Sequence, residues 1–224
     1  ARNEAIKKSS GELIAFLDVD DWWDENYLSS KKKFLNDKNI DYFYSNVFLY
    51  RENKKKFIKY NKFDLPDGKI FNNLAKKYFI IISGLIIKKK ILEKENYFNE
   101  KYNIIGDYDL IMRISKYANA KSFNEASIFY RVHSNNFSRL NNEMHYFEYK
   151  DWYYRQKKIN DYDFQINKDK FLLELNRLDI IHNLNKQKNF NLFVKIIKYP
   201  VLIYKLKFLI AMMLPLNLVN YLRK

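Results

Sequence analysis

The chain has 224 residues, which is enough for one domain with a sizeable core and an appendage. It holds no cysteine and only three histidines, which excludes disulfides and thiolate metal sites and leaves little room for a multi-histidine zinc centre. The net charge of +15 favours anionic partners. The lysines fall in short, scattered runs and no nucleic-acid-binding module is recognisable, so we expect no nucleic acid among the partners.

The first part of the chain predicts helices and strands in alternation. In chain order, we expect a helix over 4–10, a short buried strand over 13–17, a helix over 24–35, a strand over 40–50 with a hairpin partner over 57–60, and a helix over 70–78. A further strand over 79–87 contains Ser83 and Gly84. A glycine inside a strand marks a point where another segment approaches closely.

The second part begins in the same style and then changes. We expect a short helix over 88–94, a helix over 110–117 and a strand over 127–132, and this alternation indicates a layered α/β domain. From residue 140 onward, the sequence predicts helices over 141–158 and 168–186. A segment over 190–224 follows that is basic and apolar together.

Three carboxylates stand together at the end of the first predicted strand, Asp18, Asp20 and Asp21. They repel one another and resist desolvation, so the arrangement costs stability unless a positive charge lies there. A hard divalent cation with oxygen ligands, shared with a phosphate, fits this pattern. The alternative is that Asp21 caps a helix that begins at Trp22 and that the other two acids are solvated.

The last segment, 199–224, combines lysines with an apolar run over 208–218. The run is too short to span a bilayer, and Pro215 interrupts it. A basic amphipathic segment that lies in the membrane interface fits the pattern. The alternative is a terminal helix that packs on the domain or on a partner subunit.

Several short motifs recur in an order and rough spacing that are informative together, over residues 1 to about 138. They are Ala1-Arg2-Asn3, Ser10 to Trp22, Ile82 to Lys88, Phe98-Asn99-Glu100, Gly106 to Leu110 with Arg113, and Tyr130-Arg131-Val132-His133 with Asn136 and Ser138. This set resembles the nucleotide-sugar half of the family 2 glycosyltransferases with the GT-A fold.

The resemblance implies an α/β GT-A fold, with a mixed sheet flanked by helices over 1–138. A helical extension over 139–198 and the basic, amphipathic, membrane-associated tail over 199–224 would follow. Such domains normally open with a strand–helix–strand unit that cradles the nucleotide, and the chain begins after that point of the pattern. We therefore expect a fragment of the catalytic domain that lacks this unit.

The resemblance also implies site residues. Asp18 and Asp20 correspond to the paired acids of the family's DxD motif, and Asp20 would bind Mg²⁺ or Mn²⁺ with His133 as a further ligand or diphosphate contact. Arg2 and Asn3 would contact the donor, unless they cap the first helix. Within this pattern, Asp21 is expected to cap the following helix rather than to bind metal.

By the same resemblance, Asp107 would be the general base that takes the proton from the acceptor hydroxyl in an inverting transfer. Gly106 stands where the family often has a glutamate. Arg113 is expected to orient Asp109 or to face solvent, and Ser83 and Gly84 either line the acceptor cleft or mark a tight packing site.

The function that the resemblance implies is transfer of a sugar from a nucleotide-diphosphate sugar, a UDP-sugar, to a glycan or lipid-linked acceptor. The expected setting is cell-surface polysaccharide synthesis at the cytoplasmic face of the inner membrane. The alternative is a non-catalytic, membrane-associated binding module derived from such an enzyme. A P-loop phosphoryl-transfer protein is disfavoured because no glycine-rich phosphate loop is present.

Overall fold

The structure is a computed structural model that describes residues 1–52, 55–159 and 161–214. The chain divides into two compact units, the first over Ala1–Asn136 and the second from Phe137 onward. The separation of a tail over 199–224 stays a prediction, and the part of that tail over 215–224 lies outside the described residues.

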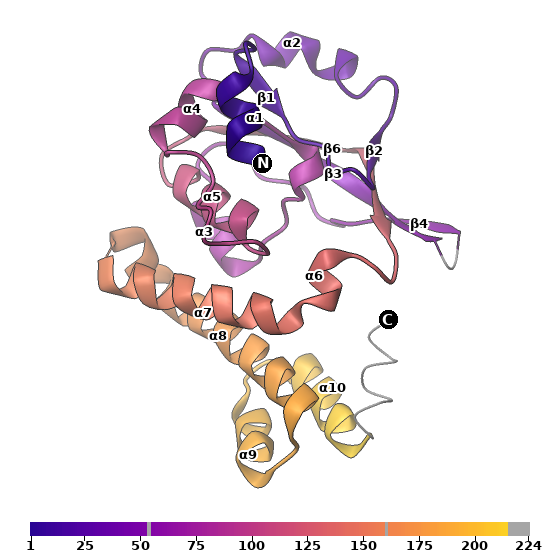
Figure 1. Cartoon of the computed structure of the whole chain (residues 1–224), viewed down its shortest axis with the longest axis vertical. Helices are drawn as coiled ribbons and strands as arrows, with labels where there is room; N and C mark the ends of the chain where they lie inside the picture. The colour runs from indigo at the N-terminus through magenta and orange to yellow at the C-terminus, as the bar shows by residue number, and fades with distance from the viewer. Residues whose placement is uncertain (53–54, 160, 215–224) are drawn as a thin grey trace. The chain divides into compact units, whose positions relative to one another are not determined.

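A mixed sheet forms the centre of the first unit (Figure 1). Among the described residues it has six strands in the order β1-β5-β3-β6-β2, with β4 paired to β3. The pair β3 and β6 is parallel, and β1–β5, β3–β5, β3–β4 and β2–β6 are antiparallel. The strands are β1 (Leu13–Ala15), β2 (Trp22–Trp23), β3 (Tyr42–Arg51), β4 (Lys56–Lys59), β5 (Leu85–Lys88) and β6 (Ala120–Val132).

Short helices accompany this sheet, and the α/β fold class predicted from the sequence is confirmed. The helices of the first unit are α1 (Arg2–Lys8), η1 (Ser29–Lys31), α2 (Lys32–Leu35), α3 (Phe71–Lys76), η3 (Ile82–Gly84), α4 (Lys89–Lys94) and α5 (Gly106–Ile114).

Strand β3 runs through the middle of the core because β5 and β6 pair with its two edges. Its residues 42–47 are all buried, as expected for a central strand rich in aromatic and β-branched side chains. Phe43 points to the face that holds Tyr27, Ile86 and Ile128. Tyr44 points to the opposite face, where its ring centroid lies 5.9 Å from that of Phe79. The sheet is therefore covered on both faces.

Strand β6 is longer than the predicted strand over 127–132. Its first residues, Ala120 to Phe123, pair in register with Tyr42 to Ser45, and the register then shifts around Asn46. The irregularity lets the strand continue to Val132, where it delivers Arg131 and the residues that follow to the candidate site.

The helix predicted over 24–35 is mostly absent, and only η1 and α2 form in this region. The reason lies just before it, where Trp22 and Trp23 form strand β2 and pair with Phe129 and Ile128. Trp22 stacks on Phe129 with 5.0 Å between ring centroids. Since no helix begins at Trp22, the prediction that Asp21 caps one is wrong.

Two other strand predictions need correction. The first strand is β1, which ends at Ala15 and lies at an edge of the sheet, so Leu17 is exposed rather than buried. The strand predicted over 79–87 is only β5, preceded by η3. The close approach predicted at Gly84 is confirmed, because a Cβ there would lie 2.9 Å from Ile128 Cδ1 and 3.1 Å from the Ser45 carbonyl oxygen.

The second unit consists of helices, as the sequence predicted for this region. They are α6 (Phe137–Leu140), α7 (Asn142–Ile159), α8 (Tyr162–Lys186), α9 (Phe190–Lys198) and α10 (Leu202–Met213). Helix α8 begins earlier than predicted because the Asp161 carboxylate accepts a hydrogen bond from the Phe164 amide at 3.1 Å and caps the helix. Within the described ranges, no helix has the length and apolar character needed to cross a membrane.

Candidate active site

The loop between β1 and β2 carries Asp20 to the end of β6. Oδ2 of Asp20 lies 3.0 Å from Nε2 of His133, which follows β6 directly. The Asn136 side-chain Nδ2 donates to the same carboxylate oxygen at 3.3 Å, and its side-chain Oδ1 accepts from the His133 backbone amide at 2.8 Å. Two of the residues assigned to metal binding from the sequence, Asp20 and His133, thus lie face to face.

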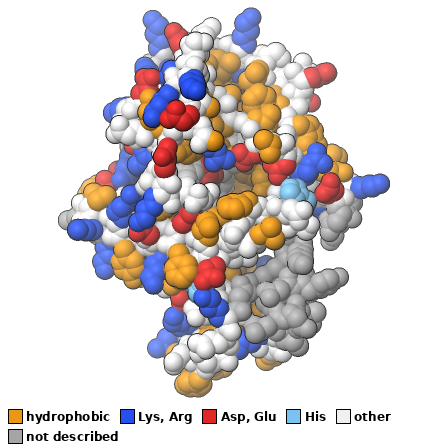
Figure 2. Space-filling view, viewed as in Figure 1, with side chains coloured by type: hydrophobic (Ala, Val, Ile, Leu, Met, Phe, Trp, Pro, Cys, Tyr) orange, Lys and Arg blue, Asp and Glu red, His pale blue; other side chains and the backbone are white. Residues whose placement is uncertain are grey.

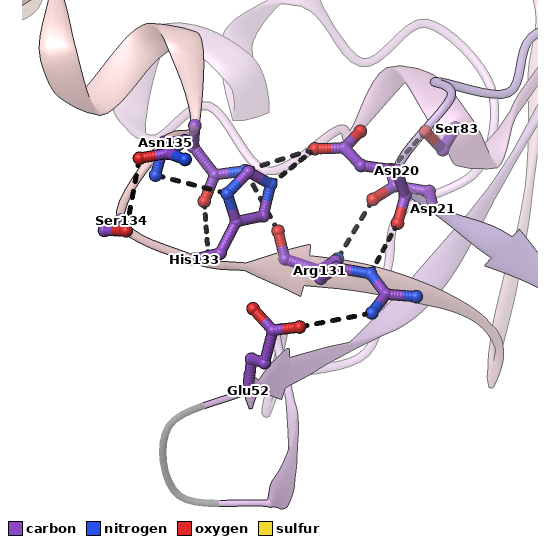
Figure 3. A network of polar contacts seen from close by, with 9 residues as sticks. Asp20, Asp21, Glu52, Ser83, Arg131, His133, Ser134 and Asn135 are labelled. Atoms are coloured by element: carbon purple, nitrogen blue, oxygen red, sulfur yellow. Dashed lines mark hydrogen bonds and ion pairs between the residues drawn. The ribbon is translucent and has the colours of Figure 1, made fainter.

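Arg131 fastens this loop to the sheet (Figure 3). Its Nε donates to the Asp20 carbonyl oxygen at 3.0 Å, and its guanidinium lies 5.0 Å from the ring centroid of Trp22. Nη1 of Arg131 lies 3.5 Å from a carboxylate oxygen of Glu52. The arginine holds the backbone of Asp20 while leaving that carboxylate free to face His133.

Asp21 has a role that the sequence did not predict. Its Oδ2 accepts a hydrogen bond from Ser83 Oγ at 2.5 Å, and its Oδ1 accepts one from the Arg131 amide at 3.0 Å. Ser83 Oγ in turn accepts from the Asp18 amide at 3.2 Å. The buried carboxylate of Asp21 therefore joins the acidic loop to Ser83 in η3 and to the end of β6, as Figure 3 shows.

Burial raises the pKa of Asp21 to about 6, and the nearby charges of Asp20 and Asp18 act in the same direction. The hydrogen bonds from Ser83 and from the Arg131 amide oppose this rise because they stabilise the carboxylate.

A second group of charges gathers around Asp107, which lies in the first turn of α5. Nη2 of Arg2 forms an ion pair with Asp18 Oδ1 at 2.8 Å, and both residues are close enough to act on Asp107. Burial raises the pKa of Asp107 to about 6, the Asp18 charge adds to the rise and the Arg2 charge opposes it. A carboxylate with this pKa is ionised near neutral pH and more basic than an ordinary aspartate, as a general base requires.

Asn3 is occupied elsewhere. Its side-chain amide donates to the Phe98 carbonyl oxygen and to Glu100 Oε1, both at 2.9 Å, and its carbonyl oxygen accepts from the Phe98 amide at 3.0 Å. The side chain is buried and fixes the segment over 98–100 to α1. The helix cap expected for Asn3 is wrong, because α1 begins at Arg2 and Ala1 holds the cap position. The donor contacts of Arg2 and Asn3 stay predictions.

Arg113 was expected either to orient Asp109 or to face solvent, and it orients Asp109. Its Nε lies 3.1 Å from the fully buried Asp109 carboxylate, and its Nη1 lies 2.8 Å from Glu95 Oε2. These ion pairs join α5, the helix that carries Asp107, to the segment that contains Glu95.

The fit of a metal ion can be judged from Asp20 and His133. Among the described residues, no group of three or more histidine, aspartate or glutamate side chains is placed to hold an ion. One carboxylate and one imidazole still form a fitting partial set, because Mg²⁺ and Mn²⁺ sites in phosphate-transferring enzymes take further ligands from substrate phosphates and water. The two side chains converge at 3.0 Å, so the residues present fit such an ion.

Sequence reasoning missed Ser83 and Glu52 as partners of this network and gave Asn136 no role. Ser83 was expected to line the acceptor cleft or to mark a tight packing site, and its bond to Asp21 spans 62 residues of sequence. Glu52 reaches Arg131 because β3 and β6 are parallel neighbours, a pairing that no local pattern reveals.

Solved structures with the same architecture were found. The crystal structure of Staphylococcus aureus TarS residues 1–349 in complex with UDP-GlcNAc matches with a TM-score of 0.51 and 14% identity, over 89% of this chain and 61% of that chain. A second TarS crystal structure gives a TM-score of 0.51 at 16% identity, over 97% of this chain and 37% of that chain.

Among curated proteins, the Escherichia coli UDP-Glc:alpha-D-GlcNAc-diphosphoundecaprenol beta-1,3-glucosyltransferase WfaP is 30% identical over 139 residues, which is 62% of this chain and 53% of WfaP. The E. coli enzyme WfgD, with the same printed activity, is 32% identical over 55% of this chain and 46% of WfgD. The chain spans about half the length of the curated relatives it matches.

The mixed sheet with its acidic loop, together with these neighbours, defines an α/β domain of the GT-A class. The family model described as glycosyl transferase family 2 matches residues 1–118, which is more than half of the chain. The chain belongs to this family, and the resemblance drawn from its motifs is confirmed.

Proposed function

We propose that the protein is an inverting, metal-dependent glycosyltransferase that moves a sugar from a UDP-sugar to a hydroxyl group of a lipid-linked glycan. The observation that carries this proposal is the loop over 18–21, which brings Asp20 to His133 and Asp18 to Arg2 beside Asp107. Family membership and the lipid-linked acceptors named for the two E. coli relatives support it.

Asp107 acts as the general base. Its carboxylate accepts the proton of the acceptor hydroxyl as that oxygen attacks the anomeric carbon, and a single displacement of this kind inverts the anomeric centre. Burial raises the pKa of Asp107 to about 6, so the group is ionised near neutral pH and holds the proton better than a solvated aspartate does.

Asp20 and His133 hold the divalent ion, and Asn136 supports the Asp20 carboxylate by its hydrogen bond. When bound, the ion supplies Lewis-acid stabilisation of the diphosphate leaving group. Arg2 lies exposed beside Asp18, where its guanidinium can pair with a donor phosphate, a geometry for which arginine is well suited.

The setting we propose is the cytoplasmic face of the membrane, in the assembly of a surface polysaccharide. The support is chemical, because an acceptor anchored in lipid confines the enzyme that uses it to a membrane surface.

The test is release of UDP from UDP-glucose and from UDP-GlcNAc, measured with and without Mn²⁺ and with a diphosphoundecaprenol-linked acceptor. We expect Mn²⁺-dependent release that Asp20→Ala abolishes and that Asp24→Ala leaves unchanged, since Asp24 is exposed outside the site and accepts a hydrogen bond from the Asn26 amide. Absence of binding of any UDP-sugar with Mn²⁺ or Mg²⁺ by the protein restored at its N-terminus, measured by calorimetry, would exclude the transferase function.

A further inference from the structure

Helices α9 and α10 are apolar on two sides. One side of each packs into a core cluster of the second unit, to which α9 contributes Leu192 and Ile196, α10 contributes Phe208, and α8 contributes Ile180 and Leu184. A surface helix of a globular protein normally turns polar residues outward once its core side is filled.

The outward sides of both helices carry a second apolar stripe. Phe190, Phe193 and Ile197 recur at the spacing i, i+3, i+7 on α9, and Ile203, Leu206 and Ile210 recur at the same spacing on α10. This spacing places each set on one face of its helix. The six side chains, called the α9–α10 face below, are between 41% and 76% exposed.

The charge around the α9–α10 face has one sign. No acidic residue follows Asp179 in the chain, and the two helices carry Lys195, Lys198, Lys205 and Lys207. Lys195 forms an ion pair with Asp179 at 2.6 Å, whereas Lys198 and Lys207 are exposed and stand next to Ile197 and Leu206 of the face. Hydrophobic and basic side chains lie next to one another at the foot of the space-filling view, where α9 lies (Figure 2).

We propose that the α9–α10 face binds the surface of a bilayer that contains anionic lipids, with both helices lying in the interface plane. This inference deepens the proposed function by naming the surface that meets the membrane. It rests on the proposed function only for the reason why the protein would bind a membrane. Apolar side chains flanked by lysines are the composition of interfacial helices, in which burial of apolar area and attraction to anionic headgroups add. Both helices are too short to span a bilayer, so they lie flat.

A second copy of the chain fits the α9–α10 face less well. Two identical faces that carry lysines and no acidic residue would bring like charges together on burial, and burial of unpaired like charges costs free energy. An anionic lipid surface supplies the opposite charge and needs no matching side chains.

The experiment is co-sedimentation of the full protein with vesicles of phosphatidylcholine alone and with added phosphatidylglycerol. We expect wild-type protein to sediment with the phosphatidylglycerol vesicles and to remain mostly soluble with phosphatidylcholine. The variant Phe193→Ser/Ile197→Ser/Leu206→Ser/Ile210→Ser should lose at least about tenfold in partition, because each exposed apolar side chain contributes to burial in the interface. Circular dichroism and thermal melting establish that this variant is folded.

Matched controls separate the face from general hydrophobicity and charge. Tyr162→Ser/Ile166→Ser removes side chains that are 77% and 53% exposed on the first turns of α8, and should bind vesicles like wild type. Lys198→Gln/Lys207→Gln should weaken binding to phosphatidylglycerol vesicles by about fivefold per lysine. Lys157→Gln/Lys158→Gln, on α7, should not.

The proposal is overturned if wild-type protein stays in the supernatant with both vesicle types, or if the four-serine variant binds as well as wild type. It is also overturned if wild type is a dimer that the four-serine variant converts to a monomer, because a second copy then covers the face. Vesicle binding needs no sugar donor, so the two experiments test the two proposals separately. Loss of vesicle binding would overturn the membrane proposal alone, and absence of UDP release would overturn the proposed function alone.

Discussion

His133 Nε2 lies 3.0 Å from Asp20 Oδ2, although 113 residues separate the two along the chain. The contact depends on β6, which runs parallel to β3 and ends where the acidic loop turns into β2. Because the two side chains lie in direct contact, we expect the pair to work as one unit toward a divalent ion.

The first prediction concerns this pair. Asp20→Ala and His133→Ala should each lower the rate of Mn²⁺-dependent UDP release by about 100-fold or more, and the double variant should lose little beyond either single one. Removal of the metal with a chelator should give the same loss in wild type. Losses that add fully in the double variant would show that the two side chains act separately.

A second prediction is a pH profile set by Asp107. A general base must be ionised, so the rate should rise with pH through about 6 and level off above it, because burial raises the pKa of Asp107 to about 6. Asp107→Asn should lower the rate by about 100- to 10,000-fold above pH 6, and its profile should lack this rise. The rate of UDP release in the presence of acceptor, measured at each pH for wild type and for the variant, tests both expectations. A wild-type profile that is flat between about pH 5 and about pH 8 would contradict the assignment of Asp107 as the base.

The same carboxyl should reduce stability. Its pKa is higher in the folded chain, about 6, than the ordinary 3.8, so the folded state binds the proton more tightly than the unfolded state. The stability that this group contributes is present below about pH 4 and is lost as pH rises through about 6. Above pH 6, the free energy of unfolding of Asp107→Asn should therefore be about 1–3 kcal/mol higher than that of wild type. Denaturant melts at low pH provide the internal control, since the difference should shrink there.

Asp21 should act as a positioning residue. Asp21→Ala removes the acceptor for Ser83 Oγ and the Arg131 amide, which frees the loop that carries Asp20. We expect the Mn²⁺ concentration for half-maximal activity to rise about 10- to 100-fold, as for loss of groups that orient metal ligands, while the pH profile set by Asp107 keeps its shape. The exposed Asp24→Ala serves as the matched control. An altered pH profile with unchanged Mn²⁺ dependence would refute this role.

Gly84 offers a prediction about stability alone. Gly84→Ala places a methyl group 2.9 Å from Ile128 Cδ1 and 3.1 Å from the Ser45 carbonyl oxygen, and the central strand cannot yield, so we expect a loss of about 1–3 kcal/mol. Gly106→Ala is the control, because its nearest atom would be Phe98 Cδ1 at 3.9 Å and the residue opens α5. Thermal melts that show equal stability for the two variants would contradict the packing argument.

The sequence predicted the architecture well where one local pattern determined the outcome. The central strand β3, its hairpin partner β4 and the helix α7 form close to the predicted residues, because aromatic alternation and helical spacing are local properties. The motifs around Asp20, Asp107 and His133 also predicted residues that the fold gathers into one region.

The failures share one cause, which is tertiary pairing. Trp22 and Trp23 have no strand pattern of their own and become β2 only because Phe129 and Ile128 lie opposite. Asp21 precedes helix-forming residues and so resembled a cap, but the hydrogen bond from Ser83, 62 residues away, determines its role. The bonds of Asn3 to the segment over 98–100 likewise span 95 residues or more of sequence, while its donor contact stays a prediction.

Strand β1 has a consequence for work with this chain in solution. It is only Leu13–Ala15, it lies at the edge of the sheet, and the residues after it leave Leu17 exposed. An edge strand beside exposed apolar side chains can pair with another molecule, and a very short strand is one of the means by which proteins limit such pairing. Pairing of the isolated chain through this three-residue edge should therefore be weak, and light scattering at rising concentration measures it.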